Sequence, residues 1–123
     1  MKRYVAEPGS ELVRDEMERA TAWFMCRVGF VETMRAVGIV AGSAGARAVR
    51  REWPVIGVVE VDRQLAEHAG AMALTHGLRS LDALHLAAAL VLPRDDLVLA
   101  TWDARLHRAA ALEGLRLLPE ALG

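Results

Sequence analysis

The sequence of 123 residues has a single cysteine, Cys26, and lacks an apolar run long enough to cross a bilayer. One thiol cannot form an internal disulfide or build a zinc site, and this is typical of proteins from a reducing cytoplasm. The longest apolar run, residues 81–92, is short and contains Asp82 and His85. We therefore expect a soluble cytoplasmic protein without a membrane span.

Two sequence patterns of common enzymes are also missing. There is no glycine-rich phosphate loop, which argues against nucleotide hydrolysis of the P-loop kind. Ser10, Ser43 and Ser80 lack the flanking residues of a nucleophile elbow, which argues against serine hydrolase chemistry.

An excess of either charge is absent as well. Fifteen basic and sixteen acidic residues leave a formal net charge of −1. This balance argues against a protein that coats nucleic acid, but it allows an enzyme that contacts nucleic acid locally. With 54% hydrophobic and 25% charged residues, the composition excludes disordered and collagen-like chains. A chain of this length can bury roughly two-thirds of its unfolded surface, so we expect one domain over residues 1–123.

The hydrophobic pattern predicts strands that alternate with helices. Strands are expected over residues 21–26, 55–61, 97–100 and 115–118. One helix is expected to begin at Pro8, and a second covers residues 28–40. A loop at 42–45 is followed by a short helix that ends near Trp53. Three more helices are expected: from Asp62 to Gly77, from a Ser80 cap to Leu92, and from Asp103 to Gly114. This alternation implies βαβ units and a parallel sheet with helices on both faces. Ligands of such sheets bind beyond the carboxyl ends of the strands.

Two acidic residues are expected near that edge of the sheet, and a third is a further candidate for a site. Asp103 closely follows one strand, Glu32 lies in the first or second turn of the helix after another, and Asp82 lies in an apolar first turn. Two carboxylates about 5 Å apart repel by roughly 3 kcal/mol at an effective dielectric near 20, and a divalent cation reverses the sign. All-oxygen ligands select a hard ion such as Mg²⁺ or Mn²⁺, which can promote phosphodiester hydrolysis.

Each acid also has a purely structural interpretation. Asp82 and Asp103 are placed where an acid caps a helix or interacts with its dipole. Glu32 can face solvent and pair with Arg35 three residues later. The spacing alone leaves both interpretations open.

Four segments, taken in order, resemble a known family. Residues 78–87, Leu-Arg-Ser-Leu-Asp-Ala-Leu-His-Leu-Ala, resemble the most recognisable motif of PIN-domain ribonucleases of the VapC toxin type. Segments 4–10, 31–35 and 99–106 resemble the start of the family's first helix, its Val-Glu-x-x-Arg segment and the strand end that carries its last acid. The resemblance covers essentially the whole chain, and the ordered combination is specific although each piece alone is weak.

The resemblance implies a fold, an activity and partners. The fold is α/β, a three-layer αβα sandwich with a central, mostly parallel sheet. The activity is that of a Mg²⁺- or Mn²⁺-dependent endoribonuclease toxin, with RNA as substrate, a cognate VapB-like antitoxin and a homodimeric state. By position, Glu32, Asp82 and Asp103 match three metal-binding catalytic acids of the family. Thr101 matches the catalytic-site hydroxyl that supports the last acid or a metal-bound water.

The start of the sequence departs from the family pattern. The family opens with a strand ending in Asp-Thr or Asp-Ser, followed by a lysine before a tyrosine. Here Lys2 and Tyr4 match those two residues, so the resemblance implies that the family's first strand and its leading catalytic aspartate would precede Met1. Two explanations are open: a start codon placed too late, or a naturally short, catalytically impaired module that dimerises or binds an antitoxin. If the chain begins at Met1, we expect weak metal binding and little nuclease activity, which strong chelator-sensitive RNA cleavage would contradict.

Three further clusters are candidates for partner contacts. Arginines within 47–51 and basic residues within 105–108 could hold an RNA backbone or form a solvated surface. Trp23, Phe24 and Phe30 could belong to the core or to a groove for a second copy or an antitoxin helix.

Overall fold

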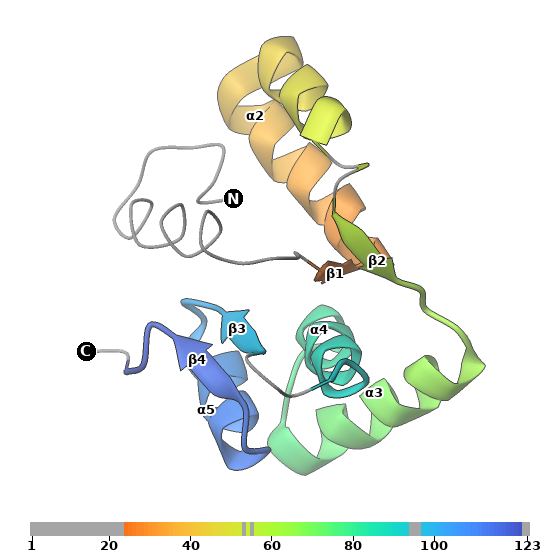
Figure 1. Cartoon of the computed structure of the whole chain (residues 1–123), viewed down its shortest axis with the longest axis vertical. Coiled ribbons are helices and arrows are strands. Elements are labelled where there is room, and N and C mark those ends of the chain that lie inside the picture. The colour runs from red at the N-terminus through yellow and green to blue at the C-terminus, as the bar shows by residue number, and fades with distance from the viewer. Residues whose placement is uncertain (1–23, 53, 55, 94–96, 122–123) are drawn as a thin grey trace. The chain divides into compact units, whose positions relative to one another are not determined.

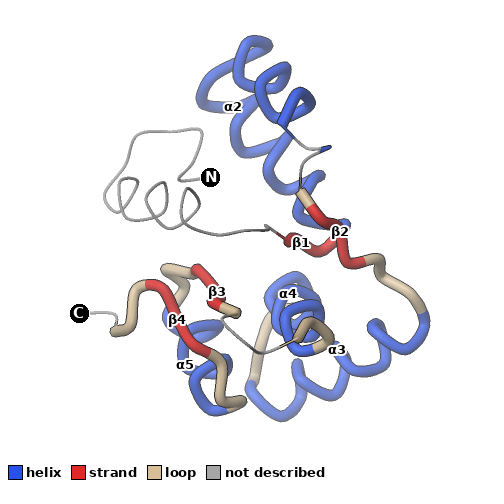
Figure 2. The backbone as a smooth tube through the Cα atoms, viewed as in Figure 1, coloured by secondary structure: helices blue, strands red, loops and turns tan. Residues whose placement is uncertain are grey.

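The computed structural model describes residues 24–52, 54, 56–93 and 97–121. The chain divides after Val59 into two compact units, each of which is described by itself. Within each unit, two parallel strands are joined through a helix (Figures 1 and 2). The predicted α/β class and the parallel pairing of strands are thereby confirmed. The single domain over residues 1–123 stays a prediction, and the helix expected from Pro8 lies outside the described residues.

The first unit contains a βαβ arrangement. It consists of β1 (Phe24–Cys26), α2 (Arg27–Glu52) and β2 (Gly57–Val59). The two strands pair in parallel, with Met25 opposite Val58. Cys26, Val37 and Val49 are buried, so one face of α2 contributes to the core. Both strands lie within the predicted ranges, of which residues 21–23 and 55 lie outside the described residues.

The helix α2 bends at a glycine. Gly42 has φ 65° and ψ −155°, a backbone conformation that glycine adopts readily. Three residues later, a Cβ at Gly45 would lie 2.7 Å from both Ala41 Cβ and Val37 Cγ1, so the close approach requires glycine there. The loop predicted over 42–45 was therefore wrong in its extent, because only Gly42 leaves the helical region before the basic segment resumes as helix.

The second unit contains three helices and a second parallel strand pair in its described part. Its elements are α3 (Arg63–His76), α4 (Ser80–Leu90), β3 (Val98–Ala100), α5 (Ala104–Leu112) and β4 (Arg116–Leu118). The helix α3 packs extensively on α4, α4 also contacts α5, and α5 packs on β4. Leu99 of β3 lies opposite Leu117 of β4. The β3–α5–β4 segment is thus a second βαβ arrangement.

The helix α4 supplies much of the core of this unit. Leu86 and Ala87 are 0% exposed, and Ala83 is 1% exposed. The small alanine side chains let neighbouring helices approach α4 closely, and interiors packed in this way tolerate little displacement. The apolar run that carries Asp82 is therefore a core helix, and its packing fixes where Asp82 lies.

Local capping signals define the ends of α3. Asp62 precedes the helix, and its Oδ1 accepts a hydrogen bond of 2.8 Å from the backbone N–H of Leu65. Gly77 ends the helix in the left-handed region at φ 64°, as predicted. The predicted Ser80 cap is wrong: Arg79 has the extended backbone of the N-cap (φ −66°, ψ 157°), and Ser80 is already the first helical residue of α4.

Two histidines fix α5 against its neighbours. His76 Nε2, at the end of α3, lies 2.7 Å from Glu113 Oε2, which follows α5, and the His76 side chain is 8% exposed. His107 Nε2, within α5, lies 2.8 Å from the carbonyl oxygen of Pro119. The helix α5, which Asp103 caps, is therefore held at its far end by α3 and along its length by the segment after β4.

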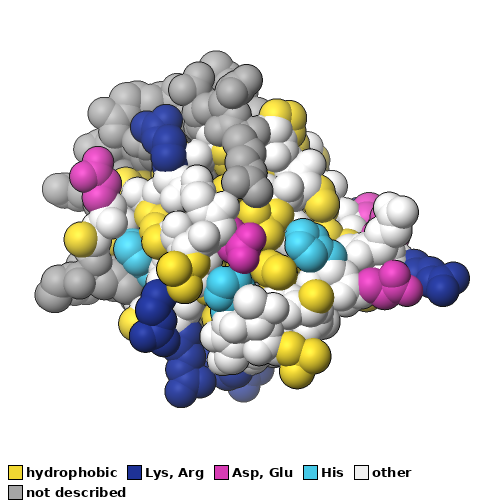
Figure 3. Space-filling view, turned by 90° about the horizontal axis from the view of Figure 1, so that it is seen from below, with side chains coloured by type: hydrophobic (Ala, Val, Ile, Leu, Met, Phe, Trp, Pro, Cys, Tyr) yellow, Lys and Arg dark blue, Asp and Glu magenta, His cyan; other side chains and the backbone are white. Residues whose placement is uncertain are grey.

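Apolar side chains also reach the surface. In the second unit, Leu74 is 89% exposed and Leu112 is 73% exposed. On the face drawn in Figure 3, hydrophobic side chains lie between charged and histidine side chains. Exposed leucines are ordinary in folded proteins.

No helix in the described ranges is both long enough and apolar enough to cross a membrane.

Candidate functional site

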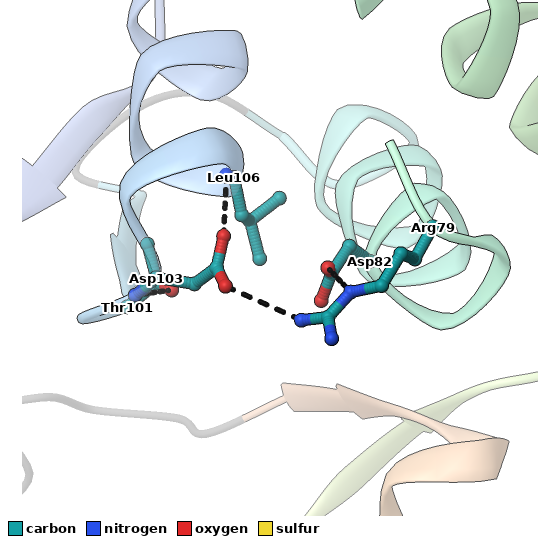
Figure 4. Close-up of polar contacts among 5 residues, drawn as sticks. All are labelled: Arg79, Asp82, Thr101, Asp103 and Leu106. Atoms are coloured by element: carbon teal, nitrogen blue, oxygen red, sulfur yellow. Dashed lines mark hydrogen bonds and ion pairs between the residues drawn. The ribbon is translucent and has the colours of Figure 1, made fainter. Parts of the chain in front are cut away.

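Two of the predicted site acids lie together in the second unit (Figure 4). Asp82 is the third residue of α4, and Asp103, three residues after the end of β3, is the N-cap residue of α5. The Asp82 side chain is 17% exposed and that of Asp103 is 37% exposed. Both carboxylates lie at helix N-termini, where the peptide dipoles favour negative charge. The packing of α4 against α5 brings these two helix ends together.

A single arginine contacts both acids. Arg79 donates from Nε to Asp82 Oδ2 at 3.3 Å and from Nη2 to Asp103 Oδ2 at 3.4 Å. Figure 4 shows its guanidinium between the two carboxylates. Both distances exceed the usual value of about 2.9 Å for such bonds, and the Arg79 side chain is 73% exposed. The two ion pairs are therefore weak contacts at the surface.

Arg79 was not among the site residues predicted from the sequence. Its spacing of three residues from Asp82 on the same helix end was a usable signal for an ion pair. Its contact with Asp103, 24 residues away, depends on how α4 packs against α5 and leaves no local pattern in the sequence.

The two carboxylate oxygens of Asp103 have different contacts. Oδ1 accepts a hydrogen bond of 2.9 Å from the backbone N–H of Leu106 and so caps α5. Oδ2 points instead to Arg79 (Figure 4). The structural interpretation of Asp103 is therefore confirmed for one oxygen, while the second oxygen faces the cation that Asp82 also contacts.

Thr101 fixes the backbone that carries Asp103. Its Oγ1 accepts a hydrogen bond of 3.1 Å from the Asp103 N–H. Its own N–H donates to the carbonyl oxygen of Leu118 at 3.1 Å, which continues the pairing of β3 with β4. The hydroxyl thus supports the last acid through the main chain, and its catalytic role stays a prediction.

Glu32 lies in the other unit. It occupies the second turn of α2, six residues after the end of β1, and is half-buried. Its convergence with Asp82 and Asp103 stays a prediction. Among the residues that the structure describes, no three histidine, cysteine or acidic side chains form a group that could hold a metal ion.

The carboxylate oxygens of Asp82 and Asp103 are suitable ligands for a hard cation. Both Oδ2 atoms already contact one positively charged group, so two carboxylate oxygens converge where a cation is favourable. Carboxylate oxygens are ligands of Mg²⁺ and Mn²⁺, and Mg²⁺ is commonly held by one or two of them. The residues present therefore fit the ion that the family resemblance implies.

The other predicted contact clusters are partly exposed. Exposed arginines are found near the end of α2 and in α5: Arg47, Arg50, Arg51, Arg105 and Arg108. Phe24 is 51% exposed and Phe30 is half-buried, whereas Trp23 lies outside the described residues. Contacts of these clusters with RNA or with another chain stay predictions.

The two contacts of Asp103 can be separated by mutation. Asp103→Ala removes the cap of α5 and should lower the free energy of unfolding by about 1 kcal/mol. Asp103→Asn retains a side-chain oxygen for the Leu106 N–H and should lose only a few tenths of a kcal/mol, since the ion pair with Arg79 is exposed. Urea unfolding of both variants measures the difference. Equal losses in the two would contradict a structural role for the cap.

Comparison with known proteins places the chain in a family. The family model of the PIN domain matches residues 4–112. Ribonuclease VapC45 of Mycobacterium tuberculosis (strain CDC 1551 / Oshkosh) and Ribonuclease VapC49 of Mycobacterium tuberculosis (strain ATCC 25618 / H37Rv) are each 31% identical over 131 residues, with 99% of this chain and 91% of the relative covered. Ribonuclease VapC46 of the latter strain is 31% identical over 118 residues, covering 96% of this chain and 89% of its own. The predicted PIN-like α/β fold is thereby confirmed, and the chain belongs to the PIN domain family as a member of the VapC type.

Proposed function

We propose that this protein is a metal-dependent endoribonuclease toxin that hydrolyses RNA phosphodiester bonds. The main observation behind the proposal is that Asp82 and Asp103, at the N-termini of two helices, both contact the guanidinium of Arg79. Similarity over nearly the whole chain to proteins named ribonuclease VapC supports RNA as the substrate class.

In this proposal, Asp82, Asp103 and Glu32 would hold Mg²⁺ or Mn²⁺. Such an ion would activate a water and offset negative charge on the phosphate. Oδ1 of Asp103 accepts from the Leu106 N–H, so the cap orients the carboxylate and leaves Oδ2 to contact a cation such as the Arg79 guanidinium. Thr101 keeps the main chain of Asp103 in place through its hydroxyl.

The proposal includes partners and a location. A VapB-like antitoxin neutralises the toxin, and the VapC names of the relatives support this partner. The protein forms a homodimer, acts in the cytoplasm and folds residues 1–123 as one domain.

The half-exposed Phe24 is a candidate contact for a second copy or an antitoxin helix, because aromatic anchors are enriched at interfaces. The exposed arginines of α2 and α5 are candidate contacts for the RNA backbone.

Removal of metal tests the proposed activity. Native protein purified from its own cells and freed of antitoxin should cleave RNA in the presence of Mg²⁺ or Mn²⁺. Excess EDTA should reduce cleavage to background, and added Mn²⁺ should restore it, because the carboxylates need a divalent ion to act on a phosphate. Gel electrophoresis of a labelled RNA measures the products.

The result also separates the proposed enzyme from a non-catalytic module that dimerises or binds an antitoxin. Such a module should show no site-specific Mn²⁺ binding by calorimetry and no chelator-sensitive cleavage. Cleavage that persists unchanged in EDTA would refute the metal-dependent proposal.

A further inference from the structure

We propose that Arg79 is a built-in competitor of the divalent cation. Its guanidinium offsets part of the negative charge of Asp82 and Asp103 in the metal-free protein and has to leave before these carboxylates bind Mg²⁺ or Mn²⁺. The inference rests on the proposed function, because it concerns the regulation of the same pair of acids.

The contacts of Arg79 end on the oxygens that a cation would need. Both of its hydrogen bonds go to an Oδ2 atom, one on Asp82 and one on Asp103. In Asp103 the other oxygen is already used, because Oδ1 accepts from the N–H of Leu106. Oδ2 of Asp103 is therefore the oxygen for which the guanidinium and the ion compete.

Charge prevents both cations from being held together favourably. Two carboxylates that converge repel each other, and one guanidinium relieves part of that repulsion. A divalent ion neutralises the pair completely, and the guanidinium at the same oxygens would then be repelled by the ion. Arg79 thus keeps the two acids together without metal, and its departure accompanies metal binding.

The weakness of the contacts makes this departure feasible. The two hydrogen bonds, at 3.3 and 3.4 Å, are long, and the Arg79 side chain is 73% exposed. Arg79 is the N-cap residue of α4 with an extended backbone, so its side chain can turn into solvent without opening the buried face of the helix. We therefore expect the competition to raise the metal concentration needed for binding by a modest factor.

Mn²⁺ titration by calorimetry on the native protein measures this factor. Arg79→Gln should bind Mn²⁺ about threefold to tenfold more tightly than the wild type, as expected for loss of a weak exposed ion pair. Arg79→Lys keeps the positive charge but cannot contact both carboxylates as the guanidinium does. Its Mn²⁺ affinity should therefore lie between those of the wild type and Arg79→Gln. Arg63→Gln is the matched control, because it removes an exposed positive charge that pairs with Glu67 within α3 and should change the affinity less than twofold.

NMR reports on the arginine itself. In ¹⁵N-labelled protein, the Nε–H signal of Arg79 should shift during a MgCl₂ titration with the same midpoint as ion binding. The Nε–H of Arg63 is the internal control, because it donates at 3.1 Å to Glu67, an exposed carboxylate within α3 that is not proposed to bind metal. Its signal should stay in place.

The outcomes separate this inference from the proposed function. If Asp82→Asn binds Mn²⁺ as the wild type does, or if neither wild type nor Arg79→Gln binds Mn²⁺, the proposed metal site fails and the competitor with it. If binding depends on Asp82 but Arg79→Gln binds no more tightly, Arg79 is no competitor and the proposed function stands. A static Arg79 signal at saturating Mg²⁺ also overturns the inference. Tighter binding by Arg79→Gln together with the Arg79 shift supports it.

Discussion

Replacing Asp82 by asparagine is expected to reduce RNA cleavage by more than about a hundredfold. Loss of groups that only support a metal ligand typically costs about 10–100-fold in affinity or activity, and loss of a direct anionic ligand should exceed this. The asparagine side chain has nearly the same shape, so the buried face of α4 stays packed. The substitution removes an ion pair with a largely exposed arginine, and such pairs contribute about 0–1 kcal/mol. Activity should therefore fall far more than stability.

A second acid in the same unit provides the control for this prediction. Glu67 also pairs with an arginine, Arg63 at 3.1 Å, but its side chain is 67% exposed in the middle of α3. Glu67→Gln should leave cleavage unchanged. Initial rates at saturating Mn²⁺, Mn²⁺ affinity and thermal unfolding are measured for both variants. Undiminished cleavage by Asp82→Asn, or an equal loss in Glu67→Gln, would refute the role proposed for Asp82.

Features that depend on a few adjacent residues were predicted well. Asp62 caps α3 and Gly77 ends it because the side-chain oxygen and the left-handed backbone act within one helical turn. The strands β2, β3 and β4 lie within the expected ranges because β-branched and leucine-rich runs are short and clearly bounded. Local chemistry was sufficient in each of these cases.

Predictions failed where contacts beyond the adjacent residues decide the outcome. Ser80 has the chemistry of an N-cap, but α4 begins one residue earlier, after the turn that buries Leu78 at 8% exposure. The break in α2 is confined to Gly42, and the close approach of Gly45 to Val37 lets the helix resume at once. A local preference for a cap or a loop cannot anticipate contacts of this kind.

The candidate site contains residues that the sequence indicated and a contact that depends on packing. The family resemblance indicated Asp82 and Asp103, and the structure brings their Oδ2 atoms to a common partner. That partner could not be predicted, since the Arg79–Asp103 contact exists only because α4 packs against α5. Asp103 also shows why spacing left two interpretations open: one residue caps a helix through Oδ1 and contacts Arg79 through Oδ2, so a structural role does not exclude the proposed one.

The dependence of the site on core packing predicts a large effect at Leu86. This residue is 0% exposed and lies one turn after Asp82 on α4. Leu86→Ala is expected to lower the free energy of unfolding by about 2–5 kcal/mol, because the lost burial is added to the cost of the cavity that remains. That is a large part of the roughly 5–15 kcal/mol by which most domains are stable.

An exposed leucine distinguishes loss of packing from loss of a leucine as such. Leu74 is 89% exposed on α3, so Leu74→Ala should change the stability by less than about 0.5 kcal/mol. Urea unfolding followed by circular dichroism measures both variants. Because Leu86 holds the helix that positions Asp82 and Arg79, Leu86→Ala should also weaken Mn²⁺ binding at temperatures where it remains folded. A loss of stability below about 1 kcal/mol would contradict a central place for α4 in the core, and unchanged Mn²⁺ affinity would separate the site from that packing.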